Sequence, residues 1–350
     1  MMKNCSQQLL VSIGIPVYNV ESFIEKCIVS VFNQSYQNLE ILIIDDCGQD
    51  KSMDIVYRLQ NNHPCGSFIK VVKQPNNRGL GEARNAAIKS ATGKYIFFLD
   101  SDDYIEPNTI ELMLEEAEKN SSDVVLASMR CVNYETGEVT PAFTYESHKV
   151  IDGKDAFANL VCANLRWNVT VTSTNILFSM DFLKKNNLLF SIRTSEDSLF
   201  LSDYYSCVNT AILLPNITYN YVIHKGSLMG YEIRDVIPVW QIRERFKGDA
   251  IMTERSRRLK NRSFYDVHCA RVMKHKFRAV CVALRHRNRF SERLTDKEIA
   301  ADLKHPASLG EILRFKRYLL FNLCFYVLGS LPSPISIMGA KLIGKVLHWI

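Results

Sequence analysis

The first 130 residues alternate apolar runs with amphipathic stretches. Four near-continuous apolar runs predict buried strands at residues 9–18, 39–46, 68–74 and 94–100. The stretches between them, 21–34, 50–62 and 81–92, have the apolar spacing of helices. Buried strands joined by helices predict an α/β fold with a mostly parallel sheet that is covered by helices on both faces.

The pattern from residue 121 to 230 is less regular. It predicts two strands joined by a Thr-Gly turn, at 121–135 and 136–146. A helix is expected at 153–165, and the β-branched run 169–179 reads as a strand. Residues 195–208 predict a helix with Ser195 as its cap, and 211–224 predict two short strands around Pro215.

The chain becomes helical and basic after about residue 235. From Trp240 to Ile350 there are 23 Lys and Arg against 9 Asp and Glu, although the whole chain has a net charge of only +6. This asymmetry predicts two parts with different partners, residues 1–230 as an acidic body and 231–350 as a basic, partly apolar helical region.

The last forty residues leave two interpretations open. Residues 317–331 are apolar but short for a membrane span, and 335–350 have helical apolar spacing with Lys341 and Lys345. A basic region ahead of such segments suits an anionic membrane surface at the inner face of the cytoplasmic membrane. The alternative is a helical subdomain that packs on the first part of the chain. The region lacks the interleaved aromatic and basic residues of RNA-binding proteins, so nucleic acid is not an expected partner.

The ten cysteines show no CxxC pair and no zinc-ligand spacing. The amino terminus is polar and has no apolar leader, so we expect free thiols in the reducing cytoplasm.

Three carboxylates, Asp100, Asp102 and Asp103, directly follow the fourth apolar run. Such a cluster requires a cation, and its hard oxygen ligands suit Mg²⁺ or Mn²⁺ shared with a diphosphate. The plain alternative is a solvated turn that supplies helix-capping carboxylates. Because ligands of parallel sheets bind at the carboxyl ends of strands, the position favours a site. Asp45 and Asp46 close the second strand at the same edge, where a carboxylate can accept a nucleobase N–H.

Further candidate site residues lie elsewhere in the sequence. Arg78 and Arg84 can bind phosphate in a bidentate manner. Glu196 and Asp197 either complement a helix dipole or supply a general base. His224, Lys225 and Ser227 form either a surface turn or a set of donors for a leaving phosphate. The match of GLGEAR to a dinucleotide fingerprint is accidental, because it lacks the third glycine and follows the third strand.

Together these residues resemble glycosyltransferase family 2, the inverting class with the GT-A nucleotide-diphospho-sugar transferase fold. The resemblance covers residues 9–230 and implies that residues 1–230 form the catalytic domain. It rests on five motifs in order: VSIGIPVYN, LEILIIDDCGQDKS, NRGLGEARNAAIKSATGKYIFFLDSDDYIEP, SEDSLF and YVIHKGSL. In the second motif, Cys47, Gly48 and Gln49 stand where Gly-Ser-Thr is commoner, which would reshape the base pocket.

The resemblance implies a role for each candidate. The base would be Asp197, with Glu196 orienting the acceptor or the base. Asp102 would hold Mn²⁺ or Mg²⁺ through the diphosphate, with Asp103 in support. Asp46 would accept the pyrimidine N–H. The remaining nucleotide-sugar contacts would come from Pro16, Tyr18, Asn19, Arg78, Arg84, Asp100, Ser101, His224 and Ser227.

The implied activity is transfer of a hexose or N-acetylhexosamine from a nucleotide sugar, with inversion at the anomeric carbon. The expected donor is a UDP-sugar. The acceptor would be a hydroxyl of a growing surface polysaccharide or oligosaccharide, free or lipid-linked. A metal-dependent nucleotidyltransferase acting on sugar phosphates is the alternative, because it also uses a nucleotide-binding α/β domain and a carboxylate-bound metal.

Overall fold

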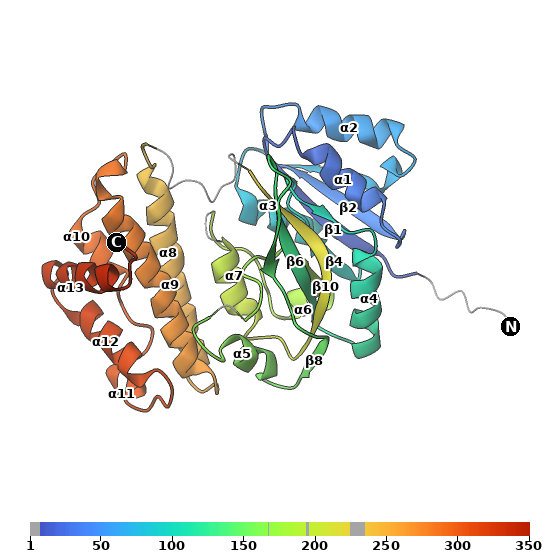
Figure 1. Cartoon of the computed structure of the whole chain (residues 1–350). Helices are drawn as coiled ribbons and strands as arrows, with labels where there is room; N and C mark the ends of the chain where they lie inside the picture. Colours follow the sequence, from blue (N-terminus) through green and yellow to red (C-terminus); the bar gives the residue numbers. More distant parts are fainter. Residues whose placement is uncertain (1–7, 167, 194–195, 225–234) are drawn as a thin grey trace. The chain divides into compact units, whose positions relative to one another are not determined.

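The computed structural model describes residues 8–166, 168–193, 196–224 and 235–350. The chain divides into two compact units, Met1–Phe157 with Val169–His224, and Ala158–Asn168 with Lys225–Ile350. The first contains the sheet and the second is helical (Figure 1). The expected boundary at residue 230 falls in 225–234, outside the described residues. The second unit also includes residues 158–168, a connection that the sequence pattern did not indicate.

Unit 1 is built on one mixed sheet with the strand order β3-β2-β1-β4-β9-β6-β10-β5. In addition, β7 pairs with β6 and β8 with β10. The strands are β1 (Val11–Val17), β2 (Leu39–Asp45), β3 (Ile69–Lys73), β4 (Tyr95–Phe98), β5 (Tyr104–Ile105), β6 (Val124–Asn133), β7 (Val139–Phe143), β8 (Lys149–Asp152), β9 (Ile176–Ser179) and β10 (Thr210–Ile223).

The predicted parallel strands are confirmed. Strands β3, β2, β1 and β4 run parallel, and every residue of β1, β2 and β4 is buried. Burial on both faces explains why their sequences are continuously apolar rather than alternating. Val17 pairs with Asp45, and Gly14 pairs with Phe98. The carboxyl ends of β1, β2 and β4 therefore meet at one edge, where the acidic motifs begin.

The second half of the sheet departs from the predicted pattern. Strand β9 runs antiparallel to both β4 and β6 and covers only the end of the expected strand 169–179. The two short strands expected around Pro215 form one strand, β10, of 14 residues. Its register with β6 shifts between Leu214 and Ile217, which accommodates a proline that cannot donate to the ladder.

The helices of unit 1 follow the sequence prediction more closely. Residues 195–208 yield a helix that starts at Glu196, and its expected cap, Ser195, lies outside the described residues. The helices are α1 (Ile24–Phe32), α2 (Ser52–Asn62), α3 (Leu80–Ser90), α4 (Thr109–Asn120), α5 (Ala156–Val161, which continues into the second unit), α6 (Met180–Lys185) and α7 (Glu196–Tyr204).

Helix α3 packs closely on β1 through small residues. A Cβ atom on Gly14 would lie 2.9 Å from Ala87 Cβ and 3.2 Å from Phe98 Cδ1. We therefore expect Gly14→Ala to lower the free energy of unfolding by about 1–3 kcal/mol, the usual cost of overpacking a core. Gly310→Ala is the control, because a Cβ there meets nothing within 4 Å. Denaturant unfolding of both variants measures the difference, and equal stabilities would contradict the close packing.

Unit 2 is a helical body around its own apolar core. Buried residues of its long helices, such as Phe277, Phe325 and Ile337, form this core. The helices are α8 (Val239–Ser256), α9 (Tyr265–Arg285), α10 (Asp296–Ala301), α11 (Leu309–Ile312), α12 (Leu319–Ser330) and α13 (Ser333–Val346). Among the described helices, none has both the length and the apolar character that crossing a bilayer requires.

Candidate active site

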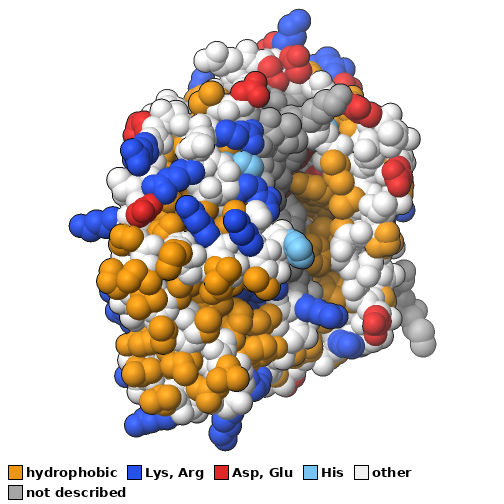
Figure 2. Space-filling view, turned by 60° about the vertical axis from the view of Figure 1, so that its left-hand side comes forward, with side chains coloured by type: hydrophobic (Ala, Val, Ile, Leu, Met, Phe, Trp, Pro, Cys, Tyr) orange, Lys and Arg blue, Asp and Glu red, His pale blue; other side chains and the backbone are white. Residues whose placement is uncertain are grey.

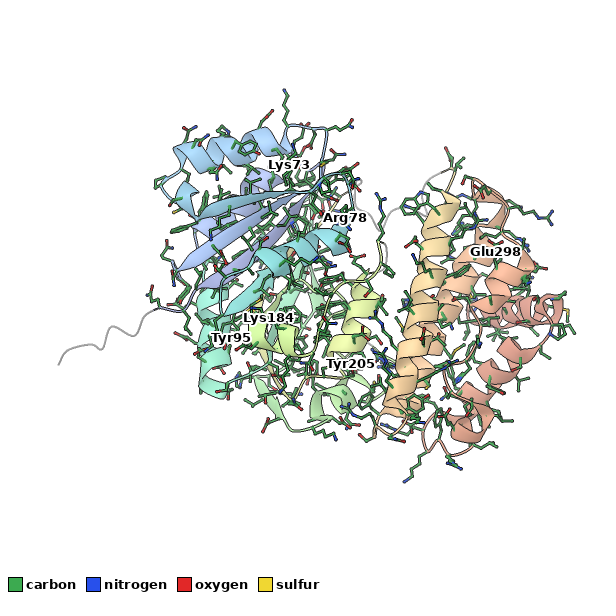
Figure 3. The ribbon with its side chains drawn as sticks, turned by 180° about the vertical axis from the view of Figure 1, so that it is seen from behind. Lys73, Arg78, Tyr95, Lys184, Tyr205 and Glu298 are labelled. Atoms are coloured by element: carbon green, nitrogen blue, oxygen red, sulfur yellow. The ribbon has the colours of Figure 1, made fainter. Side chains whose placement is uncertain are left out.

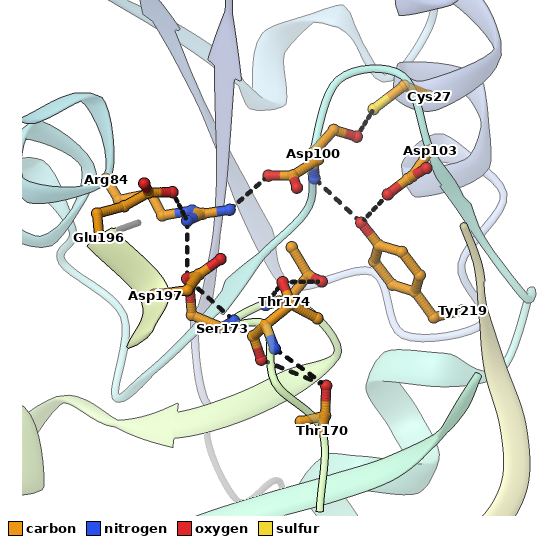
Figure 4. Close-up of polar contacts among 11 residues, drawn as sticks. Cys27, Arg84, Asp100, Asp103, Thr170, Ser173, Thr174, Glu196, Asp197 and Tyr219 are labelled. Carbon is orange, nitrogen blue, oxygen red and sulfur yellow. Dashed lines mark hydrogen bonds and ion pairs between the residues drawn. The ribbon is translucent and has the colours of Figure 1, made fainter. Parts of the chain in front are cut away.

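A buried arginine joins two acidic motifs that lie about a hundred residues apart. The side chain of Arg84, on α3, has no exposed area. Its Nη2 lies 2.8 Å from Asp100 Oδ1, and its Nη1 lies 3.0 Å from Asp197 Oδ1 and 3.3 Å from Glu196 Oε1 (Figure 4). Burial lowers the pKa of Arg84, but the three carboxylates outweigh it and hold that pKa above its ordinary value. Arg84 is thus a positive partner that the crowded carboxylates require.

Each acid of the Asp100–Asp103 cluster has a different partner. Asp100 pairs with Arg84, whereas Asp102 Oδ2 lies 3.0 Å from His224 Nε2. Asp103 accepts hydrogen bonds from the Tyr219 hydroxyl at 2.6 Å and from the Val222 N–H at 2.7 Å. This distribution separates the three carboxylates instead of leaving them to share one cation.

Exposure distinguishes Asp102 from Asp103. Asp103 is 1% exposed, and burial, followed by the charges of Asp102 and Asp100, raises its pKa well above the ordinary value. Its two bonds to β10 make it an anchor between the acidic loop and that strand. The Asp102 side chain is 28% exposed, so it can reach a ligand from solvent.

The geometry fits a cation that takes most of its ligands from the substrate. Among the described residues, no three His, Cys, Asp or Glu side chains are grouped so that they could hold a metal ion. Mg²⁺ and Mn²⁺, however, are commonly bound by one or two carboxylates together with substrate phosphates and water. Asp102, with the His224 ring beside it, meets that requirement.

Glu196 and Asp197 begin α7 and occupy different environments. Asp197 Oδ1 accepts hydrogen bonds from Arg84 Nη1, from the Ser173 N–H at 3.2 Å and from the Ser173 hydroxyl. The contacts of Asp197 within the described residues thus converge on Oδ1. Glu196 is more deeply buried, and burial, reinforced by the charge of Asp197, raises its pKa to about 7. The two adjacent acids are therefore not equivalent.

The raised pKa of Glu196 predicts a pH-dependent stability. In the unfolded chain this carboxyl ionises near pH 4.3, whereas the folded protein keeps it protonated up to about pH 7. The folded state therefore binds more protons in this window, and this contribution to stability is lost as the pH rises from about 4.3 to 7. We expect Glu196→Gln to flatten the fall in unfolding free energy across that window. Unfolding of both proteins at several pH values tests this, and identical pH profiles would contradict it.

The loops after β1 and β2 carry the residues that we predicted to line a base pocket. Tyr18 is 47% exposed and follows β1, while Pro16 is buried within that strand. Asn19 adopts a left-handed conformation with φ of 52°, and its Oδ1 accepts a hydrogen bond from the Gln49 N–H at 2.8 Å. A Cβ on Gly48 would lie 2.8 Å from Asn19 N, so the Cys-Gly-Gln loop fits closely against this turn.

Asp46 is tied to the loop that precedes α3. Its Oδ1 accepts from Gln74 Nε2 at 3.1 Å and from the Arg78 N–H at 2.8 Å, and its Oδ2 accepts from the Gly79 N–H at 3.0 Å. Gly79 has φ of 87°, a conformation that favours glycine. A carboxylate has about four lone-pair sites, so these three bonds leave room for one further donor.

The remaining candidates lie in varied positions. The side chain of Arg78, labelled in Figure 3, is 49% exposed and lies 3.3 Å from Glu82. Ser101 is buried. Lys225 and Ser227 lie outside the described residues. The structure thus brings Arg84, Asp100, Glu196 and Asp197 into direct contact and places Asp102 against His224, whereas their roles towards a nucleotide stay predictions.

Sequence reasoning missed three residues that support these acids. Ser173 contacts Asp197, Tyr219 contacts Asp103, and the Phe23 ring lies 4.3 Å from the His224 ring, measured between centroids. Ser173 belongs to a Ser- and Thr-rich run that we interpreted as a strand. Its hydroxyl groups, which bond readily to nearby backbone and carboxylates, were the available signal.

Three comparisons with known proteins place this arrangement in a family. The profile described as "Glycosyl transferase family 2" matches residues 12–185. The glycosyltransferase GlyG of Streptococcus pneumoniae serotype 4 is 26% identical over 66% of this chain and 78% of its own length. EpsJ of Bacillus subtilis, described as an uncharacterized glycosyltransferase, is 34% identical over 55% of this chain and 54% of its own length.

Solved structures of TarS from Staphylococcus aureus share the fold. The complex of TarS 1–349 with UDP has a TM-score of 0.67 at 18% identity and covers 94% of this chain and 90% of TarS 1–349. The complex with UDP-GlcNAc has a TM-score of 0.55. TarS itself, named a poly(ribitol-phosphate) beta-N-acetylglucosaminyltransferase, is 29% identical over 60% of this chain but only 35% of its own length. Sequence, fold and acidic motifs agree, and the chain belongs to glycosyl transferase family 2 as a glycosyltransferase with the GT-A fold.

Proposed function

We propose that the protein transfers a hexose or N-acetylhexosamine from a UDP-sugar to a glycan hydroxyl, with inversion at the anomeric carbon. The observation that carries this proposal is the set of ion pairs by which Arg84 joins Asp100 to Asp197. They bring the carboxylate loop at the end of β4, which suits a diphosphate, to the acids of α7, which suit an acceptor. The UDP and UDP-GlcNAc complexes of TarS, which has the same fold, support the choice of donor.

The proposed reaction is a single displacement. The acceptor oxygen attacks the anomeric carbon, the bond from that carbon to the diphosphate oxygen breaks, and the diphosphate departs with the electron pair. Asp197 takes the acceptor proton on Oδ2, because Arg84 and Ser173 occupy Oδ1. Glu196 orients the acceptor or Asp197. The buried Arg84 positions both acids through its ion pairs with them.

We assign the donor to the edge formed by β1, β2 and β4. Tyr18, with Pro16 and Asn19, lines the base pocket, and the remaining lone-pair site of Asp46 accepts the pyrimidine N–H. Asp100 approaches the ribose, with Ser101 beside it. Arg78 binds phosphate from the surface, whereas Arg84 acts on the nucleotide through Asp100 because its own side chain is buried.

Asp102 and His224 would hold Mn²⁺ or Mg²⁺ together with the diphosphate. When bound, the ion neutralises negative charge that develops on the leaving group. His224, and Ser227 beyond the described residues, are proposed to donate hydrogen bonds to the same diphosphate.

The acceptor that we propose is a growing surface polysaccharide or oligosaccharide, free or lipid-linked. TarS is named for an acceptor that is itself a polymer, poly(ribitol-phosphate), which supports this class. We place the reaction in the cytoplasm at the inner face of the membrane. The nine cysteines among the described residues form no disulfide bond, and proteins of a reducing compartment rarely contain disulfides.

Product analysis tests the proposal against nucleotidyl transfer. The purified protein is incubated with UDP-glucose or UDP-GlcNAc, with Mn²⁺ or Mg²⁺, and with water or a glycan as acceptor. We expect UDP as the released product, because the bond that breaks joins the sugar to the diphosphate. Release of pyrophosphate from UTP and a sugar phosphate, without UDP release from any nucleotide sugar, would establish the nucleotidyltransferase alternative instead.

A further inference from the structure

Helix α13 is apolar on two faces. Its inner residues, Ile337, Ala340 and Gly344, are buried in unit 2. Its outer residues Ile335, Met338, Leu342 and Val346 are 47%, 66%, 67% and 71% exposed. They recur at i, i+3, i+7 and i+11 and therefore form one stripe along the helix. A helix at the surface of a water-soluble body normally presents a polar outer face, so this stripe requires an explanation.

The neighbouring helices extend the stripe into a patch. Of the nineteen large hydrophobic side chains found exposed among the described residues, ten lie between residues 309 and 347. On the side of unit 2 that carries α12 and α13, Figure 2 shows a broad apolar surface with Lys and Arg side chains at its margin. We use the name outer face for the exposed large apolar side chains of residues 309–347, which besides the α13 stripe are Leu309, Leu313, Leu320, Val327, Leu331 and Leu347. Apolar patches of this kind mark interaction sites.

The charge around the outer face is mainly positive. From Leu309 to Ile350 the sequence contains five Lys and Arg residues and one acidic residue, Glu311, which caps α11 together with Ser308. Lys341 and Lys345 are exposed and follow Met338 and Leu342 by three residues, so they border the stripe of α13. Exposed Arg314 and Lys316 lie between α11 and α12. A lysine beside an apolar stripe can pack its methylene groups against apolar surface while its ammonium group stays in a polar environment.

The apolar stripe and its basic border together favour one kind of binding partner. A second copy of the chain, pairing face to face, would bring the same lysines together, and among residues 309–350 only the Glu311 side chain carries a negative charge to offset them. An anionic lipid surface offers both complements, acyl chains for the stripe and phosphates for its basic border. We propose that the outer face of α11–α13 binds the surface of an anionic lipid bilayer, with α12 and α13 lying in its plane.

The test is vesicle co-sedimentation of the full chain, which requires no sugar donor and is independent of the proposed function. Vesicles contain phosphatidylcholine alone or with about 30 mol% phosphatidylglycerol, in about 20 mM or about 500 mM salt. We expect the protein to bind the anionic vesicles at low salt, and to bind at least tenfold less to neutral vesicles or at high salt. No binding to anionic vesicles at low salt would overturn the proposal.

Two double variants assign the binding to the outer face. Met338→Glu with Leu342→Glu removes the centre of the stripe, and Lys341→Glu with Lys345→Glu removes its basic border. Each is expected to lower the partition coefficient on anionic vesicles at least tenfold. Their controls make the same changes in unit 1, Val139→Glu with Val150→Glu at exposed apolar positions and Lys51→Glu with Lys89→Glu at exposed lysines. The controls should bind as the wild type does, and equal losses in variants and controls would overturn the assignment.

Light scattering without lipid examines the competing occupant. We expect a mass that does not change between the wild type and Met338→Glu with Leu342→Glu. A stable dimer that this double variant dissociates would show that a second copy covers the outer face, and would overturn the lipid proposal. Circular dichroism and thermal unfolding establish that each variant is folded before its binding is compared.

Discussion

Replacing Arg84 with methionine is expected to lower the free energy of unfolding by about 3–5 kcal/mol at pH 7. The substitution keeps an unbranched side chain that fills much of the same space, but it leaves Asp100, Glu196 and Asp197 without their buried cation. Burial already raises the pKa of Asp100, and the pKa of Glu196 is raised to about 7. Without Arg84 these carboxylates would repel one another in a poorly solvated place. Denaturant unfolding at pH 7 measures the loss.

The pH dependence identifies the cause of that loss. In the variant, the carboxylates can escape repulsion by taking up protons, so the difference from the wild type should shrink as the pH falls. Arg78→Met is the matched control, because Arg78 is half exposed and its pair with Glu82 is expected to contribute no more than about 0.5 kcal/mol. A loss at Arg84 that is equal at pH 5 and pH 8, or no larger than that at Arg78, would contradict the role of Arg84.

Substitution of Asp197 by asparagine is expected to reduce sugar transfer by about 10²- to 10⁴-fold, the usual contribution of a general base. The amide keeps the size of the carboxylate and its position beside Ser173, but it cannot take the acceptor proton. Donor binding should change less than about twofold, because in the proposed assignment Asp197 faces the acceptor and not the diphosphate. Turnover with a glycan acceptor and titration with the donor separate the two effects.

The turnover of Asp197→Asn is compared with that of two other variants, Glu196→Gln and Asp54→Asn. Asp54 is exposed on α2, so its substitution should leave turnover unchanged. Glu196 is proposed to orient groups and not to accept the proton, so its amide variant should retain more activity than the Asp197 variant. If Glu196→Gln abolished transfer while Asp197→Asn remained active, the proton acceptor would be Glu196 and our assignment would be wrong.

The parallel half of the fold could be predicted from the sequence because its strands are buried on both faces. The runs that form β1, β2 and β4 are nearly continuously apolar, which few other structures require. The acidic motifs follow these runs directly, so their meeting at one edge followed from parallel pairing alone. The C-terminal helices were also evident from their spacing.

The other half depends on long-range contacts that a local pattern does not contain. Residues 169–175 have the β-branched composition of a strand, yet there the Thr172 and Thr174 hydroxyl groups lie 3.0 Å apart and Ser173 turns to Asp197. Pro215 suggested a break, but a register shift keeps β10 continuous.

The position of Arg84 shows the same limit within the site. The resemblance to the family implies that Arg84 faces the nucleotide, and this role stays a prediction. Its burial follows from α7, which starts 112 residues later and places Glu196 and Asp197 against it. The sequence around Arg84 does not indicate this contact. The burial of the Arg84 side chain is therefore evident only in the folded chain.

The central claim is that Asp102, at the carboxyl end of β4, binds a divalent ion shared with the diphosphate of a nucleotide sugar. Calorimetric titration of UDP-GlcNAc and UDP-glucose with Mn²⁺, with Mg²⁺ and with a chelator tests it most directly, on the wild type and on Asp102→Asn. We expect at least one donor to bind the wild type at least tenfold more tightly with metal than with chelator. In Asp102→Asn this metal-dependent increase in affinity should be lost. Equal affinities of the two proteins with metal, or no binding of either donor under any condition, would contradict it.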